Sequence, residues 1–298
     1  MLKQLITEQR NKNSMNLDEL SIFETIELMN KEDLNVIEAV KNELKSIEKV
    51  IETTVNCLKQ GGRLIYVGAG TSGRIGVLDA VECPPTFGMS VDKVVGVLAG
   101  GMEQMFAKEE AEDSEELGKN DMLNLSVSKN DIVIGIAASG RTPYVIGALK
   151  YANEVGAKTA SICCNKNSKI SEYSKLPIEL DNGAEILTGS TRLKAGTSQK
   201  MVCNMISTVS MIKLGKVYEN LMVDVDVSNE KLYERWLNIV MTATDCDIEK
   251  AKEYYKKSNH NAKAAICMIK LGISYETSME ELNKNDESVK KVINSNKI

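Results

Sequence analysis

The sequence predicts an α/β protein in which helices flank a parallel sheet, followed by a small helical C-terminal domain. Four near-continuous apolar runs lie at 63–70, 93–100, 131–139 and 158–165, and segments with helical spacing separate them. Such runs are typical of strands that are buried on both faces of a parallel sheet. Beyond residue 226 the sequence is charged, lacks proline and keeps a helical spacing of apolar residues, which indicates a unit of helices alone.

The N-terminal part predicts helices that lead into the first strand. Residues 1–42 are polar with scattered apolar positions, and the apolar residues within Leu17–Met29 predict one short amphipathic helix. Over Glu43–Leu58 apolar residues recur at helical spacing, and Gly61-Gly62 is typical of a helix end. We therefore expect a second helix directly before the first apolar run.

The central part alternates between strands and helices. Arg74–Val81, Glu103–Leu117 and Pro143–Val155 are helix-like and lie between the apolar runs, which favours β-α-β units. A fifth strand is expected over Leu176–Leu180, and an apolar stripe over Lys200–Leu214 predicts a core-facing helix. The expected organisation is a helical N-terminal segment at 1–42, an α/β domain at 43–222 and the helical domain at 223–298.

Composition excludes several classes of protein. The chain has 298 residues, of which 43% are hydrophobic and 27% are charged, as in ordinary globular proteins. The net charge of -5 and the scattered basic residues argue against a nucleic-acid partner. The first residues contain no apolar signal-like segment, and the run Ile132–Ala138 is too short to span a bilayer. We therefore expect a cytoplasmic protein without membrane contact.

The cysteine and histidine content argues against disulfides and metal sites. The seven cysteines form no C-x-x-C pair and are odd in number, so we expect buried small side chains in a reducing compartment. Cys83 is the only cysteine inside a motif, and its neighbours offer no basic residue to activate it. The single histidine, His260, is expected to be structural on a C-terminal helix, which leaves acid–base chemistry to carboxylates, lysine, tyrosine or water. We expect no metal and no cofactor.

The segment GAGTSGR, Gly68–Arg74, follows a predicted strand and begins a predicted helix. Glycines let the backbone approach a ligand closely, while N–H groups at a helix N-terminus and hydroxyl side chains donate to phosphate oxygens. Gly70, Thr71 and Ser72 are therefore candidate anion-binding residues. The segment lacks the lysine of a Walker loop and the G-x-G-x-x-G spacing of dinucleotide folds, so a purely structural tight turn is the alternative.

A second turn of this kind, AASGRTPYV, lies at Ala137–Val145, again between a predicted strand and a predicted helix. Parallel strands present their carboxyl ends at one edge of the sheet, where open α/β sheets bind ligands. Ser139, Gly140 and Thr142 therefore join the first turn as candidate phosphate-binding residues. A Ser-Gly turn with Pro143 in the first turn of the helix is the structural alternative.

Together these turns resemble the SIS family of phosphosugar-binding proteins. A narrower resemblance, over nearly the whole chain, is to N-acetylmuramic acid 6-phosphate etherases. ECPPTF is its most specific part, and glucokinase regulatory proteins resemble the chain more distantly. The segments that carry the resemblance are TEQRNKNS at 7–14, GAGTSGRIGVLDAVECPPTFG at 68–88, AGG at 99–101, AED at 111–113 and EILTGSTRLKAGTSQK at 185–200.

The resemblance implies an SIS-type fold and cleavage of the lactyl ether of N-acetylmuramic acid 6-phosphate, which gives N-acetylglucosamine 6-phosphate and D-lactate. It also implies that the two turns bind this phosphosugar and that two subunits pair into a homodimer. The two acid–base glutamates of the family correspond to Glu82 in ECPPTF and Glu112 in AED. The spacing before AED is slightly shorter than in the family pattern, so Asp113 or Glu109 is an alternative to Glu112.

The implied reaction needs one carboxylic acid and one carboxylate. In the open-chain sugar the C2 proton lies next to an aldehyde, so a base can remove it while an acid protonates the lactate oxygen that leaves C3. Water then adds across the double bond. Because the two groups must differ in protonation state, we predict that Glu82 lies in a less polar setting and acts as the acid, with Glu112 as the base. The reverse assignment is the alternative.

Each glutamate also has a purely structural interpretation. Glu82 could end its helix, with Pro84-Pro85 preventing continuation. Glu112 lies in the charge run EEAEDSEE, and such runs usually lie on solvated helix faces. In the later motif, Ser190, Thr191, Arg192 and Lys194 are candidate further donors, and a helix N-cap at Thr197 or Ser198 is an equally good interpretation.

Two other functions are compatible with phosphosugar-binding turns. A non-catalytic sensor would bind a hexose phosphate and contact a partner protein through the helical C-terminal part. An aldose–ketose isomerase would need a carboxylate near C2 but no acid at C3. Of these three functions, only the etherase reaction releases lactate from the muramic acid phosphate.

Overall fold

The computed structural model describes residues 5–106, 110–225, 227 and 229–296. The chain divides into two compact units. The α/β unit comprises Met1–Val81 and Asp92–Ser207, and the C-terminal unit comprises Glu82–Val91 and Thr208–Ile298. The segment Glu82–Val91, which contains all of ECPPTF, therefore groups with the C-terminal residues, although α/β segments surround it in the sequence.

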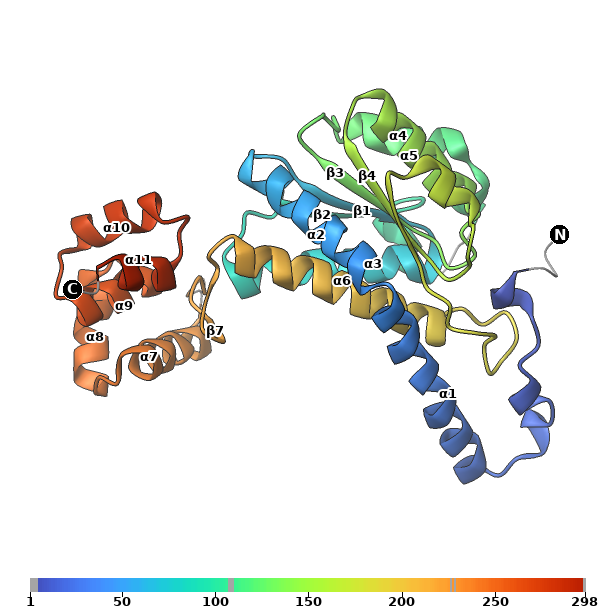
Figure 1. The fold of residues 1–298 in the computed structure, drawn as a ribbon, viewed down its shortest axis with the longest axis horizontal. Helices are drawn as coiled ribbons and strands as arrows, with labels where there is room; N and C mark the ends of the chain where they lie inside the picture. Colours follow the sequence, from blue (N-terminus) through green and yellow to red (C-terminus); the bar gives the residue numbers. More distant parts are fainter. Residues whose placement is uncertain (1–4, 107–109, 226, 228, 297–298) are drawn as a thin grey trace. The chain divides into compact units, whose positions relative to one another are not determined.

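The α/β unit is built on a parallel sheet of five strands in the order β2-β1-β3-β4-β5 (Figure 1). All five predicted strands are confirmed. Every residue of β1 and of β3 is buried, which explains why these segments contain continuous apolar runs rather than an alternating pattern. The strand bounds are Leu64–Gly68 (β1), Val94–Leu98 (β2), Ile132–Ile136 (β3), Lys158–Cys163 (β4) and Leu176–Glu179 (β5).

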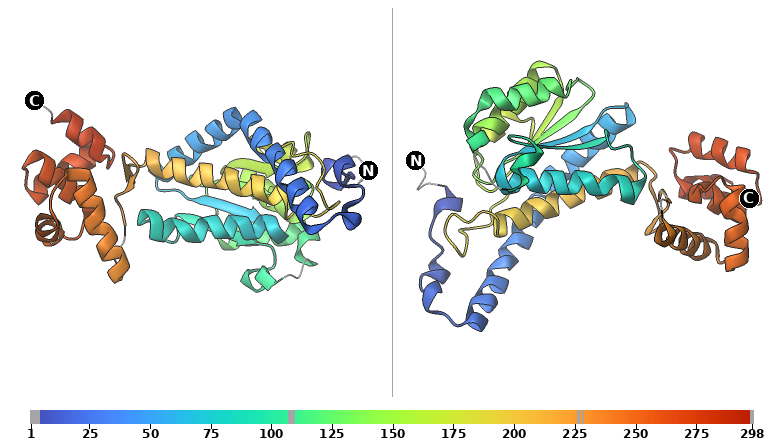
Figure 2. Two further views of the ribbon diagram at one scale, coloured as in Figure 1. Left: turned by 90° about the horizontal axis from the view of Figure 1, so that it is seen from below. Right: turned by 180° about the vertical axis from the view of Figure 1, so that it is seen from behind.

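Helices cover both faces of this sheet, as Figures 1 and 2 show. On one face, Val67 and Val133 share a buried cluster with Leu149 of helix α5. On the other face the Tyr66 hydroxyl donates to the Cys203 carbonyl of helix α6 at 3.5 Å. Helices α4 (Glu115–Asn124) and α5 (Pro143–Glu154) form the first layer, and α2 (Leu44–Lys59), α3 (Gly70–Phe87) and α6 (Lys194–Lys213) form the second. The predicted helices at Glu43–Leu58 and Pro143–Val155 are confirmed.

The prediction of one continuous helix over Glu103–Leu117 is wrong. Two short 3-10 helices, Met102–Phe106 and Glu110–Asp113, occupy most of this range, residues 107–109 lie outside the described part of the chain, and α4 begins only at Glu115. Ser114 starts α4, because its hydroxyl accepts a hydrogen bond from the Leu117 N–H at 3.1 Å. The acidic run thus belongs to a turn region and to the first turn of a helix, where acidic side chains are favourable.

The alternative interpretation, in which Glu82 ends its helix because Pro84-Pro85 prevents continuation, is also wrong. Helix α3 contains both prolines and continues to Phe87, and Gly88 follows it with a left-handed φ of 58°. Two prolines remove two helical donors and disfavour the helical conformation of the residue before each. Cys83 and Phe87, four residues apart on one face, are both buried. Burial of this shared apolar face favours continuation of the helix.

The N-terminal segment consists of short 3-10 helices followed by one long helix. The predicted short helix within Leu17–Met29 is instead a 3-10 turn at Leu17–Glu19 followed by α1, Ile22–Asn42. Ser21 and Glu24 form a capping box that sets the start of α1. Further 3-10 turns lie at Ile6–Glu8 and Lys12–Ser14.

The C-terminal unit is helical, as predicted, with a short hairpin that the sequence did not predict. Trp236 is fully buried in its core and donates to the His260 carbonyl at 2.8 Å. His260 lies in a turn rather than on a helix, is exposed, and stacks on Tyr255 with ring centroids 4.2 Å apart. The elements are β6 (Val217–Tyr218), β7 (Leu221–Met222), α7 (Glu230–Thr244), α8 (Ile248–Lys257), α9 (Ala262–Leu271), α10 (Tyr275–Lys284) and α11 (Val289–Ser295).

The cysteines behave as small apolar side chains. None of the seven is part of a disulfide, and all except Cys246 are buried. Burial raises the pKa of the Cys163 and Cys203 thiols above the ordinary value, which disfavours the reactive thiolate. Within the described ranges, none of the helices is both long and apolar enough to cross a membrane.

Candidate active site

The two glycine-containing turns lie at the same edge of the sheet. The first follows β1 and the second follows β3, and these two strands pair along their whole length from Leu64 with Ile132 to Gly68 with Ile136. Gly70 and Gly140 both have left-handed φ values, 51° and 70°, which few other residues adopt without strain. The adjacency predicted from the sequence is therefore present.

In the first turn, Thr71 and Ser72 have different surroundings. Ser72 is only 6% exposed, and its hydroxyl donates to the Gln199 side-chain oxygen at 2.9 Å. Thr71 is half-buried at the start of α3. The Ser72 hydroxyl is thus engaged inside the protein, while Thr71 and the first N–H groups of α3 lie at the edge of the sheet.

In the second turn, a candidate binding residue meets a candidate acid–base residue. Thr142 is buried, and its hydroxyl donates to the Glu112 carboxylate at 2.8 Å. Ser139 is half-buried, and its hydroxyl oxygen accepts a hydrogen bond from the Arg141 N–H at 3.3 Å. Gly140 packs so closely on Ser168 that a Cβ atom would come within 2.4 Å of the serine Cβ. The fold thus holds this turn rigidly beside Glu112.

The alternatives to Glu112 have different positions. Asp113 is exposed, whereas Glu112 is half-buried and contacts the second turn. Glu109 lies outside the described residues. Of the two described acids in AED, Glu112 is the one that a hydrogen bond links to a predicted binding residue.

Glu82 lies on α3 and is exposed, so the expectation of a less polar setting is wrong for the single chain. Its helical neighbours are nevertheless apolar. Leu78 and Val81 are 48% and 56% exposed, and Pro85 is exposed as well. Positions 78, 81, 82 and 85 share one face of a helix, so Glu82 lies within an uncovered apolar stripe.

The segment after Glu82 lies against residues of the C-terminal unit that form a group of ion pairs. Pro84, Pro85 and Gly88 line an open groove of about 940 Å³ together with Asp224 and Lys263. Gly88 lies against the Asp224 backbone, where a Cβ atom would come within 2.4 Å of the carbonyl oxygen. The Asp224 carboxylate pairs with Lys216 at 2.7 Å and with the buried Lys263 at 3.1 Å, and Lys263 also pairs with Glu287 at 2.9 Å.

The helix that supports the first turn begins earlier than predicted. α6 starts at Lys194 rather than Lys200, because the buried Glu185 carboxylate accepts hydrogen bonds from the Lys194 and Ala195 N–H groups at 3.0 and 2.9 Å. Thr197 lies inside the first turn of α6, where its hydroxyl donates to the Leu193 carbonyl. The predicted N-cap at Thr197 or Ser198 is therefore wrong. Glu185, nine residues before Lys194 in the sequence, caps the helix instead.

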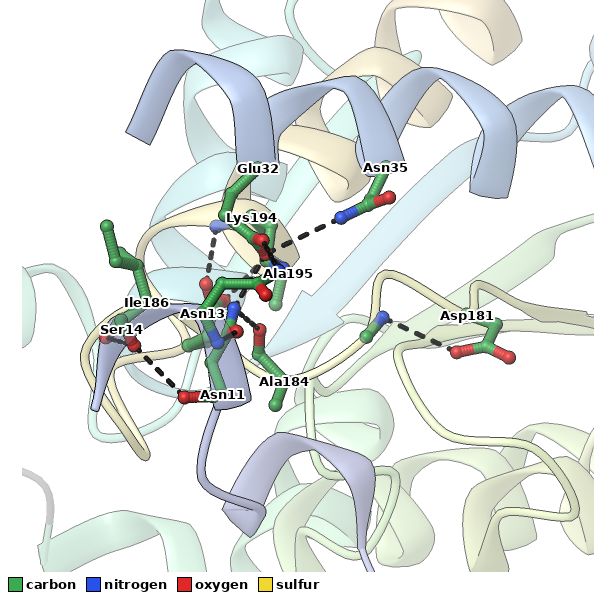
Figure 3. Close-up of polar contacts among 12 residues, drawn as sticks. Asn11, Asn13, Ser14, Glu32, Asn35, Asp181, Ala184, Ile186, Lys194 and Ala195 are labelled. Atoms are coloured by element: carbon green, nitrogen blue, oxygen red, sulfur yellow. Dashed lines mark hydrogen bonds and ion pairs between the residues drawn. The ribbon is translucent and has the colours of Figure 1, made fainter. Parts of the chain in front are cut away.

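Lys194, a candidate further donor from the sequence, is an internal residue. Its ammonium group is buried and pairs with Glu32 at 2.8 Å (Figure 3). Asn11 and Asn13 also donate to Glu32, at 2.6 and 2.8 Å. Burial opposes ionisation of Glu32, but these donors outweigh it and hold the pKa of the carboxyl below its ordinary value. Two segments of the resemblance, 7–14 and 185–200, thus meet through Glu32.

Sequence reasoning missed Gln199 and Asn165. Gln199 lies inside a quoted motif but carries no charge or hydroxyl that would mark a role, and the structure places it behind Ser72. Asn165 follows β4, and its amide donates to the carbonyls of Ala138 and Ser139 in the second turn at 3.2 and 3.3 Å. As for metals, no three His, Cys, Asp or Glu side chains of the described part of the chain gather in a way that could hold an ion.

Three segments of the chain match domains of known proteins. Residues 46–153 match the N-terminal SIS domain of glucokinase regulatory protein, residues 109–209 match the SIS domain, and residues 219–287 match the C-terminal lid domain of glucokinase regulatory protein. A phosphoheptose isomerase from Neisseria gonorrhoeae shares the fold at a TM-score of 0.50 and 17% identity, covering 64% of this chain and 98% of that one. The parallel sheet and its paired turns define an SIS-domain protein.

Several relatives match almost the whole chain. N-acetylmuramic acid 6-phosphate etherase from Bacillus cytotoxicus is 57% identical over 294 residues, which are 98% of this chain and 100% of the relative. The protein of the same name from Bacillus cereus strain 03BB102 is 56% identical with the same coverage. The chain therefore belongs to the family of N-acetylmuramic acid 6-phosphate etherases, and it is an enzyme.

Proposed function

We propose that the chain cleaves the D-lactyl ether of N-acetylmuramic acid 6-phosphate with water, which gives N-acetylglucosamine 6-phosphate and D-lactate. The names of its relatives support this substrate. The observation that carries the chemistry is the 2.8 Å hydrogen bond from Thr142 to Glu112, because it joins a phosphosugar-binding turn to a carboxylate. We place the enzyme in the cytoplasm, in the reuse of cell-wall amino sugars.

The proposed site binds the phosphate between the two turns. Backbone N–H groups at the start of α3 and hydroxyl groups from both turns donate to the phosphate oxygens. Left-handed glycines let the backbone approach the anion closely. The proposed binding residues are Gly70, Thr71, Ser72, Ser139, Gly140 and Thr142.

The proposed reaction begins with the open-chain sugar, in which the aldehyde acidifies the C2 proton. Glu112 takes that proton, the C3–O bond breaks, and Glu82 donates a proton to the lactate oxygen that carries away the electron pair. Water then adds across C2=C3 with hydrogen at C2 and hydroxyl at C3, which restores both carboxyl groups. Glu112 suits the base, because its hydrogen bond with Thr142 holds the carboxylate at the second turn, beside the proposed sugar site.

We infer that the active form is a homodimer that gives Glu82 its less polar setting. The α3 stripe around Glu82 leaves Leu78 and Val81 about half-exposed. A second stripe on α1 exposes Phe23, Ile26 and Ile37 by 69%, 54% and 52%. Exposed apolar side chains that share one helix face favour an interaction surface. We infer that a second copy of the chain covers them, because most homo-oligomers are symmetric pairs.

Incubation of the purified protein with N-acetylmuramic acid 6-phosphate tests the reaction. We expect D-lactate and N-acetylglucosamine 6-phosphate in equal amounts. Binding of the phosphosugar without lactate would favour the sensor function, and interconversion of an aldose and a ketose phosphate without lactate would favour the isomerase.

Sedimentation analysis tests the dimer. We expect the wild type to sediment at twice the chain mass of 32.8 kDa, and Ile26→Asp and Val81→Asp to shift it towards the monomer. Ile248→Asp is the matched control, because Ile248 is 47% exposed on α8, away from both stripes in the sequence. A monomeric wild type with full lactate release would contradict the proposal.

A further inference from the structure

Helix α6 packs against the start of α3 along one continuous line of contacts. A Cβ atom added to Gly196 would lie 3.5 Å from the Thr71 side chain and 3.6 Å from that of Ile75. One turn further on, Gln199 accepts the hydrogen bond from Ser72. Lys200 then pairs with Asp79 at 3.3 Å. Because positions 196, 199 and 200 share a helix face, α6 forms the wall directly behind the first turn.

Gln199 is the unusual residue of this wall. Its side chain is fully buried, and its oxygen accepts the Ser72 hydroxyl proton at 2.9 Å. Its side-chain nitrogen is also buried and has no hydrogen-bond partner within the described part of the chain. A buried amide N–H₂ without a partner destabilises the folded state. A leucine or methionine of similar size would avoid that cost, so packing alone does not explain a glutamine at this position.

We propose that Gln199 is a positioning residue for the phosphosugar, which controls whether the Ser72 hydroxyl is available to the phosphate. Without ligand, Ser72 donates to the Gln199 oxygen. When a phosphate binds at the first turn, the Gln199 amide turns over and donates its N–H to the Ser72 oxygen, and the Ser72 hydroxyl then donates to the phosphate. A hydroxyl group can donate one hydrogen bond while it accepts another. After the exchange the Ser72 hydroxyl, the Gln199 N–H and the phosphate oxygen therefore all have hydrogen-bond partners.

This inference rests on the proposed phosphosugar site but not on turnover. The test therefore measures the dissociation constant of N-acetylglucosamine 6-phosphate by calorimetry, for which no reaction is needed. We expect Gln199→Met to weaken binding about tenfold, the loss typical of one hydrogen bond to a charged group. The KM for the ether substrate should rise by a similar factor, while kcat stays within about twofold.

A double-mutant cycle with Ser72→Ala separates positioning from packing. If Gln199 acts through Ser72, the double variant binds no more weakly than Ser72→Ala alone. Additive losses would overturn the proposal, and so would unchanged binding by Gln199→Met. Absence of lactate release by the wild type would instead contradict the proposed reaction and leave this cycle interpretable.

Thermal unfolding distinguishes a positioning role of Gln199 from a structural one, because only a structural role predicts a clear loss of Tm. Gln199→Met removes an unpaired buried nitrogen but also the acceptor of the Ser72 hydroxyl, so the two effects oppose each other and we expect its Tm to stay close to that of the wild type. Ser210→Ala is the matched control, since Ser210 on α6 is also fully buried with a hydroxyl that lacks a hydrogen-bond partner among the described residues. It should leave binding unchanged. If Gln199→Met does not fold, Gln199→Leu replaces it, and a lowered Tm with unchanged binding in either variant would refute the proposal.

Discussion

The turns after β1 and β3 are similar in sequence and lie at one edge of the sheet, yet their hydroxyl groups bond to different kinds of residue. In the first turn Ser72 donates to Gln199, a neutral side chain of the helix behind it. In the second turn Thr142 donates to Glu112, a carboxylate. Two turns with the same pattern can therefore have different tasks, and we assign phosphate binding mainly to the first and coupling to the acid–base group to the second.

The largest expected effect concerns the carboxylate of the second turn. Glu112→Gln should lower kcat for lactate release by about 10²–10⁴-fold, because general acid–base catalysis contributes about that much. Glu82→Gln should have a similar effect, while binding of N-acetylglucosamine 6-phosphate persists in both variants. Near-normal turnover of either variant would remove that glutamate from the mechanism.

A large stability effect is expected where the wall of the first turn is anchored. Lys194→Met leaves the buried Glu32 without its cation, and loss of one partner of a buried ion pair costs about 3–5 kcal/mol. Denaturant unfolding measures this loss. The double variant Lys194→Met with Glu32→Leu should recover most of it, because neither charge is then left unpaired. A small loss in the single variant would show that Glu32 finds other partners.

The two turns themselves should separate in steady-state kinetics. Thr142→Val keeps the side-chain shape but removes the donor to Glu112, so we expect kcat to fall about tenfold with little change in KM. Ser72→Ala should raise KM by a similar factor with little change in kcat. If both variants changed kcat and KM in the same way, the assignment of phosphate binding to the first turn and acid–base coupling to the second would be wrong.

The smallest expected effect is a pH dependence of stability. The folded-state pKa of Glu32 lies below the ordinary value of 4.5, so the unfolded state binds more protons between the two values and the stabilisation is lost as pH falls through that window. Unfolding free energies of the wild type should therefore decline below about pH 4.5, and Glu32→Gln should flatten this decline. Equal slopes for both proteins would show that other groups dominate.

The sheet could be predicted from the sequence because its strands are buried on both faces. β1 and β3 contain apolar residues at every buried position, which leaves a continuous run that is easy to find. Helix bounds were harder to predict. The start of α6 depends on Glu185, and the continuation of α3 through Pro84 depends on burial of Phe87. Both are tertiary effects that local patterns do not contain.

The candidate site was predictable only in part. Its turns have recognisable glycines and hydroxyls, and the resemblance led to the proposal of Glu112, which the structure links to Thr142 by a hydrogen bond. Gln199 was not found, and Lys194 was expected to be a donor rather than a buried ion-pair partner, because the sequence does not show which polar residues are buried. The exposure of Glu82 also differs from the prediction, because the sequence around it does not distinguish an exposed helix face from a buried one.

The long separation between Glu32 and Lys194, 162 residues, has a consequence for synthesis of the protein. At translation speeds of about 5–20 residues per second, Lys194 leaves the ribosome roughly 8–32 s after Glu32. Until then Glu32 lacks Lys194 and Asn11 lacks the Ala184 carbonyl, so both side chains stay solvated. The many polar side chains of the N-terminal segment favour its solubility during this time, because they limit aggregation of the incomplete chain.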